Sequence, residues 1–320
     1  MKNTRWGLIG AGWIATTALA PAMHAAENTV IQAVASRDPE RSRALNPITV
    51  HESYESLIND PLVDAVYISL PNHLHCEWTA KALKAGKHVL CEKPFAMNVA
   101  EVEMMVQSAK DCNRLLVEAV WSRWHPRMIR AIDLVESGKI GQITSIDASF
   151  TFPASIEGNY RLLKEMGGGA LFDIGVYPLH AIAALVGDTA QVEIEKCDVS
   201  AGPTGIDLTT NWQMCINNSI TVKGLASFEM PENQSLVIKG EKQAITFVGD
   251  QAFTSLHAQS ALQMGGLTEE FEAVNPYMLM IENFGKQIQG EESWVLPLET
   301  SLWVQRAVDQ LHAEIKRVEL

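Results

Sequence analysis

Two glycines that follow a short apolar segment mark the first stretch able to bind a ligand. The segment Trp6–Ile9 runs into Gly10-Ala11-Gly12-Trp13-Ile14-Ala15, and a helical pattern follows. Such a loop between a strand and a helix presents backbone N–H groups and the positive helix end to a pyrophosphate. The residues predicted to contact a dinucleotide here are Gly10, Gly12, Trp13 and Ile14. A glycine turn of any α/β protein is the alternative.

The residues after the second apolar segment bear on which dinucleotide is bound. NAD sites usually place an acid there for the ribose hydroxyls, whereas NADP sites use arginine. The segment Val30–Ala35 ends in Ser36-Arg37-Asp38, without an acid at the strand end. Ser36, Arg37 and, one helical turn later, Arg41 are therefore predicted to hold the 2′-phosphate of NADP in preference to NAD. The alternative is an exposed Arg-Asp pair in which Asp38 caps the next helix.

Two further segments end in polar residues where a parallel sheet would bind its ligand. One runs into Leu70-Pro71-Asn72-His73-Leu74-His75-Cys76, and the other ends in Glu92-Lys93-Pro94. The cofactor contacts predicted here are Leu70, Pro71, Asn72, His75, Glu92 and Lys93. A cationic nicotinamide disfavours the ammonium form of a nearby lysine, so Lys93 can exchange a proton with a substrate hydroxyl. His73, His75 and Cys76 are donors that zinc accepts, but no second cluster follows, and no metal is predicted.

The most unusual stretch is Gly167-Gly168-Gly169 followed by an apolar helical pattern to His180. The glycine triplet is predicted to let substrate approach the backbone. Asp173, Tyr177 and His180 recur at i, i+4 and i+7, which places them on one helical face. Such a polar stripe is costly unless it lines a wet cleft or finds partners.

The stripe makes Asp173, Tyr177 and His180 candidates for substrate binding. The acid/base role predicted for Tyr177 comes from the resemblance described below. The alternative, above all for His180, is a satisfied hydrogen-bond network between the two domains. The loop Ile156–Met166 adds Asn159 and Arg161 as candidates for substrate binding.

Two domains must position these residues. Short apolar runs alternate with helical patterns over residues 1–121, which predicts a doubly wound parallel sheet of Rossmann type. From about Ile143 the strand patterns follow one another, so residues 122–320 are predicted to form an α+β domain with a large, mostly antiparallel open sheet. Three helices, near Ala170–Leu185, Tyr277–Gln289 and Thr300–Arg317, would cover one face of that sheet.

The bulk composition excludes several classes of partner. The 320 residues are 47% hydrophobic and 20% charged, with a formal net charge of −13. This charge repels nucleic acid and anionic membranes, and no run of Lys and Arg offsets it. Five scattered cysteines, the lack of a signal-peptide pattern and the lack of an apolar run of membrane-spanning length favour a cytoplasmic location.

Together these motifs resemble the Gfo/Idh/MocA family, the glucose-fructose oxidoreductase and inositol dehydrogenase group, over nearly the whole chain. The resemblance rests on four ordered stretches: Gly10–Ala15, Pro71–His75, Glu92–Pro94 and Gly167–His180. It implies that Lys93 is the family's essential lysine and that Asp173 contacts substrate. Much of the family has a histidine where this chain has Tyr177. The tyrosine resembles the branch with glucose-fructose oxidoreductase, dimeric dihydrodiol dehydrogenase and NADP-dependent xylose dehydrogenase.

The residues and the resemblance predict an NADP-dependent oxidoreductase acting on an aldose, a trans-dihydrodiol or a related polyol or carbonyl. Tyr177 would take the hydroxyl proton with help from Lys93, because an unperturbed phenol pKa of about 10 is too high for a base. A non-catalytic NADP-binding sensor of the same fold is the rival class. An imine or tetrapyrrole reductase is the rival enzyme.

Self-association is the remaining expectation. The resemblance implies a homodimer or a higher homo-oligomer formed through the C-terminal sheet. Strand patterns such as Thr221–Phe228 alternate apolar residues that one layer of helices would not fully cover.

Overall fold

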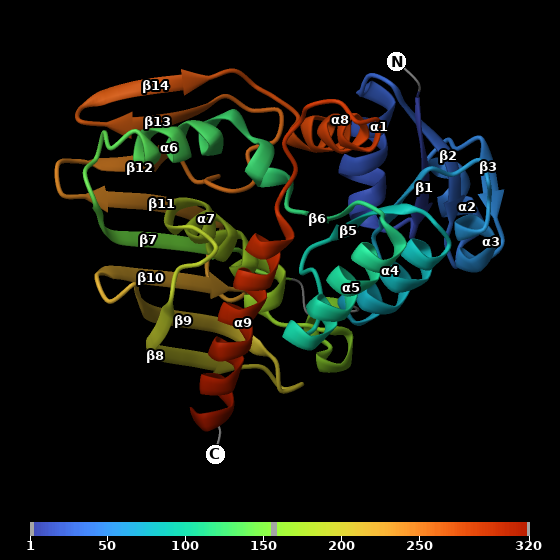
Figure 1. Ribbon diagram of the computed structural model, residues 1–320. Helices are drawn as coiled ribbons and strands as arrows, with labels where there is room; N and C mark the ends of the chain where they lie inside the picture. Colours follow the sequence, from blue (N-terminus) through green and yellow to red (C-terminus); the bar gives the residue numbers. More distant parts are fainter. Residues whose placement is uncertain (1–2, 155–158, 319–320) are drawn as a thin grey trace. The chain divides into compact units, whose positions relative to one another are not determined.

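The computed structural model describes residues 3–154 and 159–318, and the chain divides into two compact units (Figure 1). The first unit comprises Met1–Trp121 and Asn275–Ser301, and the second comprises Ser122–Val274 and Leu302–Leu320. The chain first passes from one unit to the other at the predicted domain boundary, between residues 121 and 122.

The first unit is built on a six-stranded parallel sheet with the order β3-β2-β1-β4-β5-β6. Its strands are β1 (Thr4–Ile9), β2 (Thr29–Ala35), β3 (Thr49–His51), β4 (Ala65–Ile68), β5 (His88–Glu92) and β6 (Leu116–Ala119). The central strand β4 is buried along its whole length, as expected when helices cover both faces of a parallel sheet. This is the predicted doubly wound fold.

Helices connect these strands, and α4 and α5 pack side by side (Figure 1). They are η1 (Ala15–Leu19), α1 (Ala20–Ala25), α2 (Pro39–Ala44), α3 (Tyr54–Ile58), η2 (Asn72–Leu74), α4 (His75–Lys84), α5 (Val99–Cys112) and η3 (Trp121–Trp124). Asn113 ends α5 in the left-handed conformation with φ of +50°. The sequence analysis did not predict β3 or α3, and it expected α2 only as the helix that Asp38 would cap. A three-residue strand without a buried side chain, such as β3, carries no apolar pattern.

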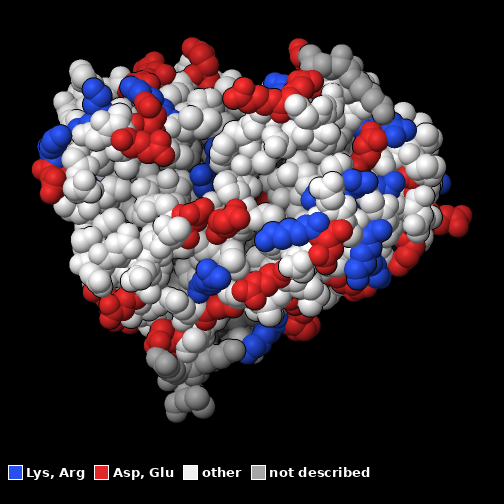
Figure 2. Space-filling view, viewed as in Figure 1, with Lys and Arg blue, Asp and Glu red and all other residues white. Residues whose placement is uncertain are grey.

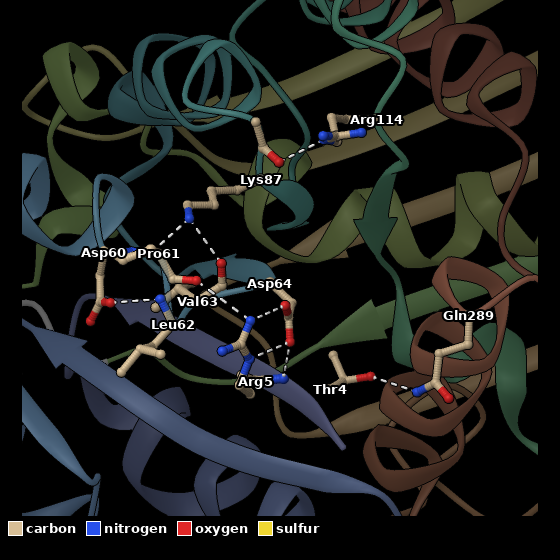
Figure 3. Close-up of polar contacts among 11 residues, drawn as sticks. Thr4, Arg5, Asp60, Pro61, Leu62, Val63, Asp64, Lys87, Arg114 and Gln289 are labelled. Carbon is tan, nitrogen blue, oxygen red and sulfur yellow. Dashed lines mark hydrogen bonds and ion pairs between the residues drawn. The ribbon is translucent and has the colours of Figure 1, made fainter. Parts of the chain in front are cut away.

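Polar contacts fix the amino-terminal edge of this sheet (Figure 3). At the start of β1, Arg5 donates from Nε to Oδ2 of Asp64 at 2.8 Å. The buried Lys87 donates from Nζ to the carbonyls of Asp60 and Val63 at 2.7 and 2.8 Å. Burial lowers the pKa of Lys87. These contacts hold together the amino ends of the strands, whereas ligand binding is predicted at their carboxyl ends.

The segment Asn275–Ser301 corrects the predicted domain limits, because it packs in the first unit and not in the second. Its helix α8 (Pro276–Ile288) places the ring of Phe284 5.1 Å from that of Trp6 in β1. Just beyond α8, Gln289 donates from Nε2 to Oγ1 of Thr4 at 3.2 Å (Figure 3). The periodicity of α8 identified a helix, but periodicity does not specify which apolar surface the helix covers.

The second unit contains an eight-stranded sheet with the order β14-β13-β12-β11-β7-β10-β9-β8. Among the described strand pairs of this second sheet, only β7–β10 is parallel. The predicted mostly antiparallel sheet is therefore confirmed. The strands are β7 (Ile143–Thr151), β8 (Val192–Ala201), β9 (Asp207–Ile216), β10 (Ile220–Ser227), β11 (Asn233–Gly240), β12 (Ala244–Val248), β13 (Ser260–Met264) and β14 (Leu267–Phe271).

Strand β10 was predicted to leave some of its apolar residues uncovered, but most of them are buried. Val222 and Ala226 are fully buried, whereas Thr221 and Lys223 on the other face are exposed. Leu225, also on that other face, is half-buried. The apolar residues of this strand therefore point mainly inward, and its outer face is largely polar.

Helices cover the inner face of the sheet, where η6 packs on β7, β9 and β10, and α7 packs on β7. The helical segments are α6 (Pro126–Glu136), η4 (Tyr160–Leu162), η5 (Lys164–Met166), η6 (Leu171–Gly175), α7 (Val176–Val186) and α9 (Leu298–Val318). Contrary to expectation, Lys164–Val186 is long and apolar enough to cross a membrane by length and composition. However, 89% of its most apolar 18-residue stretch is buried inside the protein, as in the core helix of a folded unit.

Charges of both signs are mixed on the molecular surface. Figure 2 shows Lys and Arg interspersed with Asp and Glu on the face that it draws, without a continuous basic patch there. With a net charge of −13, this face offers no surface suited to a phosphate backbone.

Candidate active site

The two glycines of the loop after β1 differ in the space around them. Gly10 has a φ of +98°, and a Cβ there would lie 2.6 Å from the carbonyl oxygen of Ser69. At Gly12, by contrast, no described atom lies within 4 Å of the Cβ position. The helical stretch begins at Trp13, which is 73% exposed, and continues through the half-buried Ile14 into the π-helical turn η1. The loop therefore leaves its backbone open to a ligand at Gly12.

After β2, Asp38 caps the next helix as the alternative interpretation expected, but it pairs with Arg41 and not with Arg37. Asp38 caps α2 by accepting from the backbone N–H of Glu40 at 3.0 Å, and it pairs with the exposed Arg41 at 3.5 Å. Ser36 donates from Oγ to the carbonyl of Asp38 at 2.6 Å. Arg37 is exposed and forms no hydrogen bond or ion pair with the described residues. The helix cap thus leaves the Arg37 guanidinium available to a ligand.

The end of β4 is joined to the turn after β5 by His75, which has no exposed surface. Its Nε2 lies 2.8 Å from the carbonyl oxygen of Leu70, and its Nδ1 lies 2.8 Å from that of Pro94. Burial lowers its pKa. A side chain in this position supports the two turns and offers no surface to a cofactor, so the predicted direct contact of His75 is corrected to a positioning role.

The other predicted contacts near these turns differ in accessibility. Leu70 and Asn72 are buried, and Pro71 is half-buried. Cys76 is buried, with Sγ 3.8 Å from the carbonyl oxygen of Glu101. The described part of the chain contains no cluster of three or more His, Cys, Asp or Glu side chains arranged to hold a metal.

Glu92 and Lys93 form a small polar cluster with Tyr67 at the carboxyl end of β5. The buried Glu92 carboxylate accepts hydrogen bonds from the Tyr67 hydroxyl and from the backbone N–H of Lys93, the latter at 3.1 Å. Burial, together with Glu92, raises the pKa of Tyr67 well above its ordinary value. Lys93 itself is half-buried and precedes a cis peptide bond to Pro94. The cluster holds the backbone from which the Lys93 side chain projects.

The second unit brings together several of the predicted substrate residues. Arg161 donates from Nε to Oδ2 of Asp173 at 2.8 Å. Burial alone would lower the pKa of Arg161, but the charges of Asp173 and of the Tyr160 and Tyr177 phenols raise it overall. Asn159 accepts from the Arg161 backbone N–H at 3.1 Å through Oδ1. Residues 156–158 of the predicted substrate loop Ile156–Met166 lie outside the described residues.

The helix that carries Asp173 and Tyr177 is not a regular α-helix. Asp173 lies in the π-helical turn η6, whereas Tyr177 and His180 lie in α7. The predicted alignment of three residues on one face assumed 3.6 residues per turn throughout, so it applies only to Tyr177 and His180. Tyr177 is 6% exposed and its ring centroid lies 5.5 Å from that of Phe150.

The glycine triplet before this helix is filled by the protein itself. A Cβ at Gly168 would lie 2.4 Å from the carbonyl oxygen of Arg161, and one at Gly169, where φ is +125°, would lie 2.1 Å from Oδ1 of Asp207. The space that was predicted for substrate at these two glycines is therefore occupied by the chain's own backbone and by a carboxylate.

Asp207, at the start of β9, is a buried residue that the sequence analysis missed. Its Oδ2 accepts from the backbone N–H of Leu171 and from Oγ1 of Thr210, both at 2.7 Å. Burial raises the pKa of Asp207 to about 6, against these two hydrogen bonds. The carboxylate satisfies an N–H at the start of the helix that carries Asp173 and Tyr177. Because its partner Leu171 is 36 positions away, no local pattern indicates it.

His180 lies deeper than a substrate contact requires. Its side chain has no exposed surface, and its backbone carbonyl accepts from Nη1 of Arg123 at 3.3 Å. These observations favour a structural role for His180 over the predicted substrate contact.

Comparisons with known proteins agree with this geometry. Residues 4–119 match the family described as "Oxidoreductase family, NAD-binding Rossmann fold", and residues 128–246 match the "GFO/IDH/MocA C-terminal domain". The chain is 31% identical to an uncharacterized oxidoreductase, ORF334, of Rhizobium meliloti, over 99% of this chain and 98% of that protein. It is 29% identical to D-xylose 1-dehydrogenase (NADP(+)) 2 of Haloferax volcanii, over 96% of each.

A solved structure extends the likeness to the fold. The 3-ketoreductase KijD10 of Actinomadura kijaniata, crystallised with NADP and TDP-benzene, superposes with a TM-score of 0.89 at 28% identity, over 98% of each chain. Both halves of the chain match in order, and the likeness to ORF334 covers nearly all of both proteins. The chain therefore belongs to the Gfo/Idh/MocA family of oxidoreductases.

Proposed function

We propose that this protein is an NADP-dependent oxidoreductase that transfers a hydride between the nicotinamide and a sugar-like alcohol or carbonyl. The observation that carries the proposal is the ion pair of Arg161 with Asp173, which the Tyr177 phenol follows four positions later on a largely apolar helix. A polar group of this kind suits a hydroxylated substrate, which needs both hydrogen-bond partners and a proton acceptor.

The first unit fits the nucleotide. Gly12 leaves backbone open beside the start of a helical stretch, where a pyrophosphate binds favourably. Arg37 is exposed and is not engaged by an acid, as a 2′-phosphate requires. Ser36 and Arg41 would add to this subsite. The Haloferax dehydrogenase is named for NADP, and the Actinomadura reductase was crystallised with it. Both support NADP as the cofactor here.

The protein's own residues would handle the proton and the orientation of substrate. NADP, when bound, supplies or accepts the hydride. Tyr177 would take the proton of the reacting hydroxyl, and the Lys93 cation would make that phenol easier to ionise. The carboxylate of Asp173, oriented by Arg161, would accept hydrogen bonds from neighbouring hydroxyls, with Asn159 near the same loop. In reduction, Tyr177 would return the proton to the alkoxide.

Aldoses and diols are the proposed substrate class. The named relatives act on xylose or on a nucleotide-linked keto sugar, and both substrates carry adjacent oxygens. The test is to incubate the purified protein with NADP or NAD and a panel of aldoses, ketoses and trans-diols, and to follow the absorbance of the reduced nicotinamide. Keto sugars with NADPH test the reverse direction. Turnover of at least one sugar or diol with NADP is expected; tight NADP binding without turnover on any member would favour the sensor.

Self-association through the outer face of the eight-stranded sheet is also part of the proposal, as is a cytoplasmic location. Alternate residues of β9 and β10, such as Gln213 and Leu225, are only half-buried, so the sheet retains surface that a second copy could cover. A dimer or larger species is expected by light scattering at micromolar concentration. A monomer there would contradict it.

A further inference from the structure

The ion pair between Arg161 and Asp173 depends on a loop that folds back onto the start of a helix. The two residues are 12 positions apart, and Nε of Arg161 lies 2.8 Å from Oδ2 of Asp173. Between them, the backbone N–H of Gly169 donates to the carbonyl of Arg161 at 2.8 Å, and that of Gly168 donates to the carbonyl of Leu163 at 2.9 Å. These bonds close residues 159–169, the Arg161 loop. The geometry of the ion pair therefore follows from how this loop closes.

Asp207, at the start of β9, lies where the Arg161 loop meets the helix. A Cβ at Gly169, the last residue of the loop, would lie 2.1 Å from its Oδ1. Its Oδ2 accepts from the backbone N–H of Leu171, in η6, and from the hydroxyl of Thr210, both at 2.7 Å. One carboxylate therefore contacts the end of the loop and binds the first turn of the helix that carries Asp173.

A second contact holds the same loop from the connection that precedes β9. Thr204, between β8 and β9, donates from Oγ1 to the carbonyl of Leu162 at 2.6 Å. Leu162 is buried and directly follows Arg161. The chain from Thr204 to Asp207 thus holds the Arg161 loop at two points, one beside Arg161 and one at the end of the loop.

The carboxylate of Asp207 serves hydrogen-bond donors and not a cation. Asp207 forms no ion pair with any residue in the described ranges 3–154 and 159–318, and it is only 5% exposed. Burying a carboxylate without a cation is costly. Near the start of a helix, however, the aligned N–H groups stabilise a negative charge. This position explains an acid here, and its burial keeps the side chain from contacting substrate.

We infer that Asp207 is a positioning residue for substrate binding. Through Leu171 and Gly169 it fixes the helix start against the Arg161 loop, which sets Arg161 and Asp173 at their paired distance. The pair then presents the Asp173 carboxylate in one orientation to neighbouring hydroxyls of the substrate. This inference rests on the proposed function, in which that carboxylate binds substrate.

Steady-state kinetics of the full-length protein, with a sugar or diol that it turns over, test the inference. Asp207→Ala removes the acceptor at the helix start and should raise KM for that substrate at least about tenfold, the factor of one hydrogen bond to a charged group. The kcat value and NADP affinity should change little. A merely structural loss lowers the fraction of folded enzyme, which lowers kcat and leaves KM unchanged. An unchanged KM, or a loss confined to kcat, would overturn the inference.

Three further variants separate this contact from general damage. Asp207→Asn keeps an acceptor for Leu171 and Thr210 and should restore KM to near the wild-type value. Asp198→Ala removes an exposed acid from the neighbouring strand β8 and should leave KM unchanged. If Asp207→Ala does not fold, Thr204→Val replaces it, because Thr204 is exposed and holds the same loop. KM should then rise about threefold, as for a lost neutral hydrogen bond, and an unchanged KM would contradict the assignment.

Hydrogen exchange gives a readout that needs no substrate. Backbone amide exchange of the full-length protein is followed by mass spectrometry in wild type and in Asp207→Ala. Faster exchange confined to residues 159–175 is expected, because Leu171 loses its acceptor and the Arg161 loop loses a contact. Equal exchange in the two proteins, or faster exchange throughout the second unit, would mean that Asp207 has no such role. If wild type turns over no sugar or diol, the proposed function fails, whereas a local change in exchange would still locate the contact through which Asp207 holds this loop.

Discussion

The two glycine-rich turns of this protein resemble each other in sequence but differ in what fills them. Both precede a helical stretch that contains a π-helical turn, η1 in the first unit and η6 in the second. At Gly12 the space where a Cβ would stand is open, whereas at Gly168 and Gly169 it is filled by Arg161 and Asp207. A run of glycines therefore marks a close approach without indicating whether a ligand or the chain itself approaches.

The largest expected effect concerns the proton transfer proposed for Tyr177, on the helix after the second turn, and Lys93. Lys93→Met and Tyr177→Phe should each lower turnover by roughly 10²–10⁴-fold, as is typical of lost acid/base catalysis. Cofactor affinity, measured by fluorescence titration, should remain in Tyr177→Phe, because Tyr177 is not among the predicted cofactor contacts. Lys84→Met, an exposed change on α4, is the control and should retain activity.

The double variant sharpens this assignment. If Lys93 and Tyr177 act on one proton, the double variant should be scarcely slower than the slower single variant. Multiplicative losses would mean that the two side chains act separately. Near-normal turnover by Tyr177→Phe would remove the tyrosine from the mechanism.

Alanine substitutions test whether the first turn is open at Gly12 and the second turn is filled at Gly169. Gly169→Ala combines a positive φ with a Cβ placed 2.1 Å from Asp207, so it should lower the unfolding free energy by roughly 2–4 kcal/mol. Gly12→Ala meets no described atom and should change stability by less than about 0.5 kcal/mol while weakening NADP binding. Urea unfolding and cofactor titration of both variants check this, and a reversed pattern would refute the difference drawn between the turns.

Asp207 makes the second turn sensitive to pH. Its pKa of about 6 lies above its value of about 4 in an unfolded chain, so between these values the folded state holds a proton that the unfolded state has lost. Its contribution to stability is therefore greatest below about pH 4 and falls as the pH rises through about 6, by up to about 3 kcal/mol.

The measurement is the unfolding free energy of wild type and Asp207→Asn at several pH values. Asparagine cannot titrate, so the difference between the two proteins should move in favour of wild type on acidification from about pH 7 to pH 4. Asp250→Asn, at an exposed position, is the control and should show little change. A difference that is independent of pH would show that Asp207 keeps an ordinary pKa.

The last prediction concerns the choice of cofactor, which is assigned to Arg37 after β2. Arg37→Ala should weaken NADP binding by about 1.5–3 kcal/mol, the value of a hydrogen bond to a charged group, and should leave NAD nearly unchanged. Arg43→Ala removes the same charge from α2 and should affect neither cofactor. Equal losses for both cofactors in Arg37→Ala would exclude a 2′-phosphate contact.

Local patterns were sufficient for most of the fold and for the first turn. Strand and helix periodicities were sufficient to predict the Rossmann sheet. The Gly10–Gly12 loop was identified because its function depends on neighbouring residues in one strand-turn-helix unit.

Features that depend on distant partners were not predictable in the same way. The role of Asp207 requires Leu171, and the burial of His75 requires the carbonyl of Pro94. The π-helical turn at Leu171–Gly175 leaves no trace in the residue types, so the spacing rule misplaced Asp173 relative to Tyr177. A helix pattern likewise could not show that α8 packs on Trp6.

The return of residues 275–301 to the first unit has a consequence for synthesis of the chain. Thr4 and its partner Gln289 are 285 positions apart. At roughly 5–20 residues per second, a ribosome needs on the order of 15–60 s to make that interval. During this time the nascent Rossmann sheet lacks α8, and Trp6 lacks the Phe284 ring that covers it in the finished protein. The amino-terminal half is therefore an incomplete folding unit until translation is nearly finished.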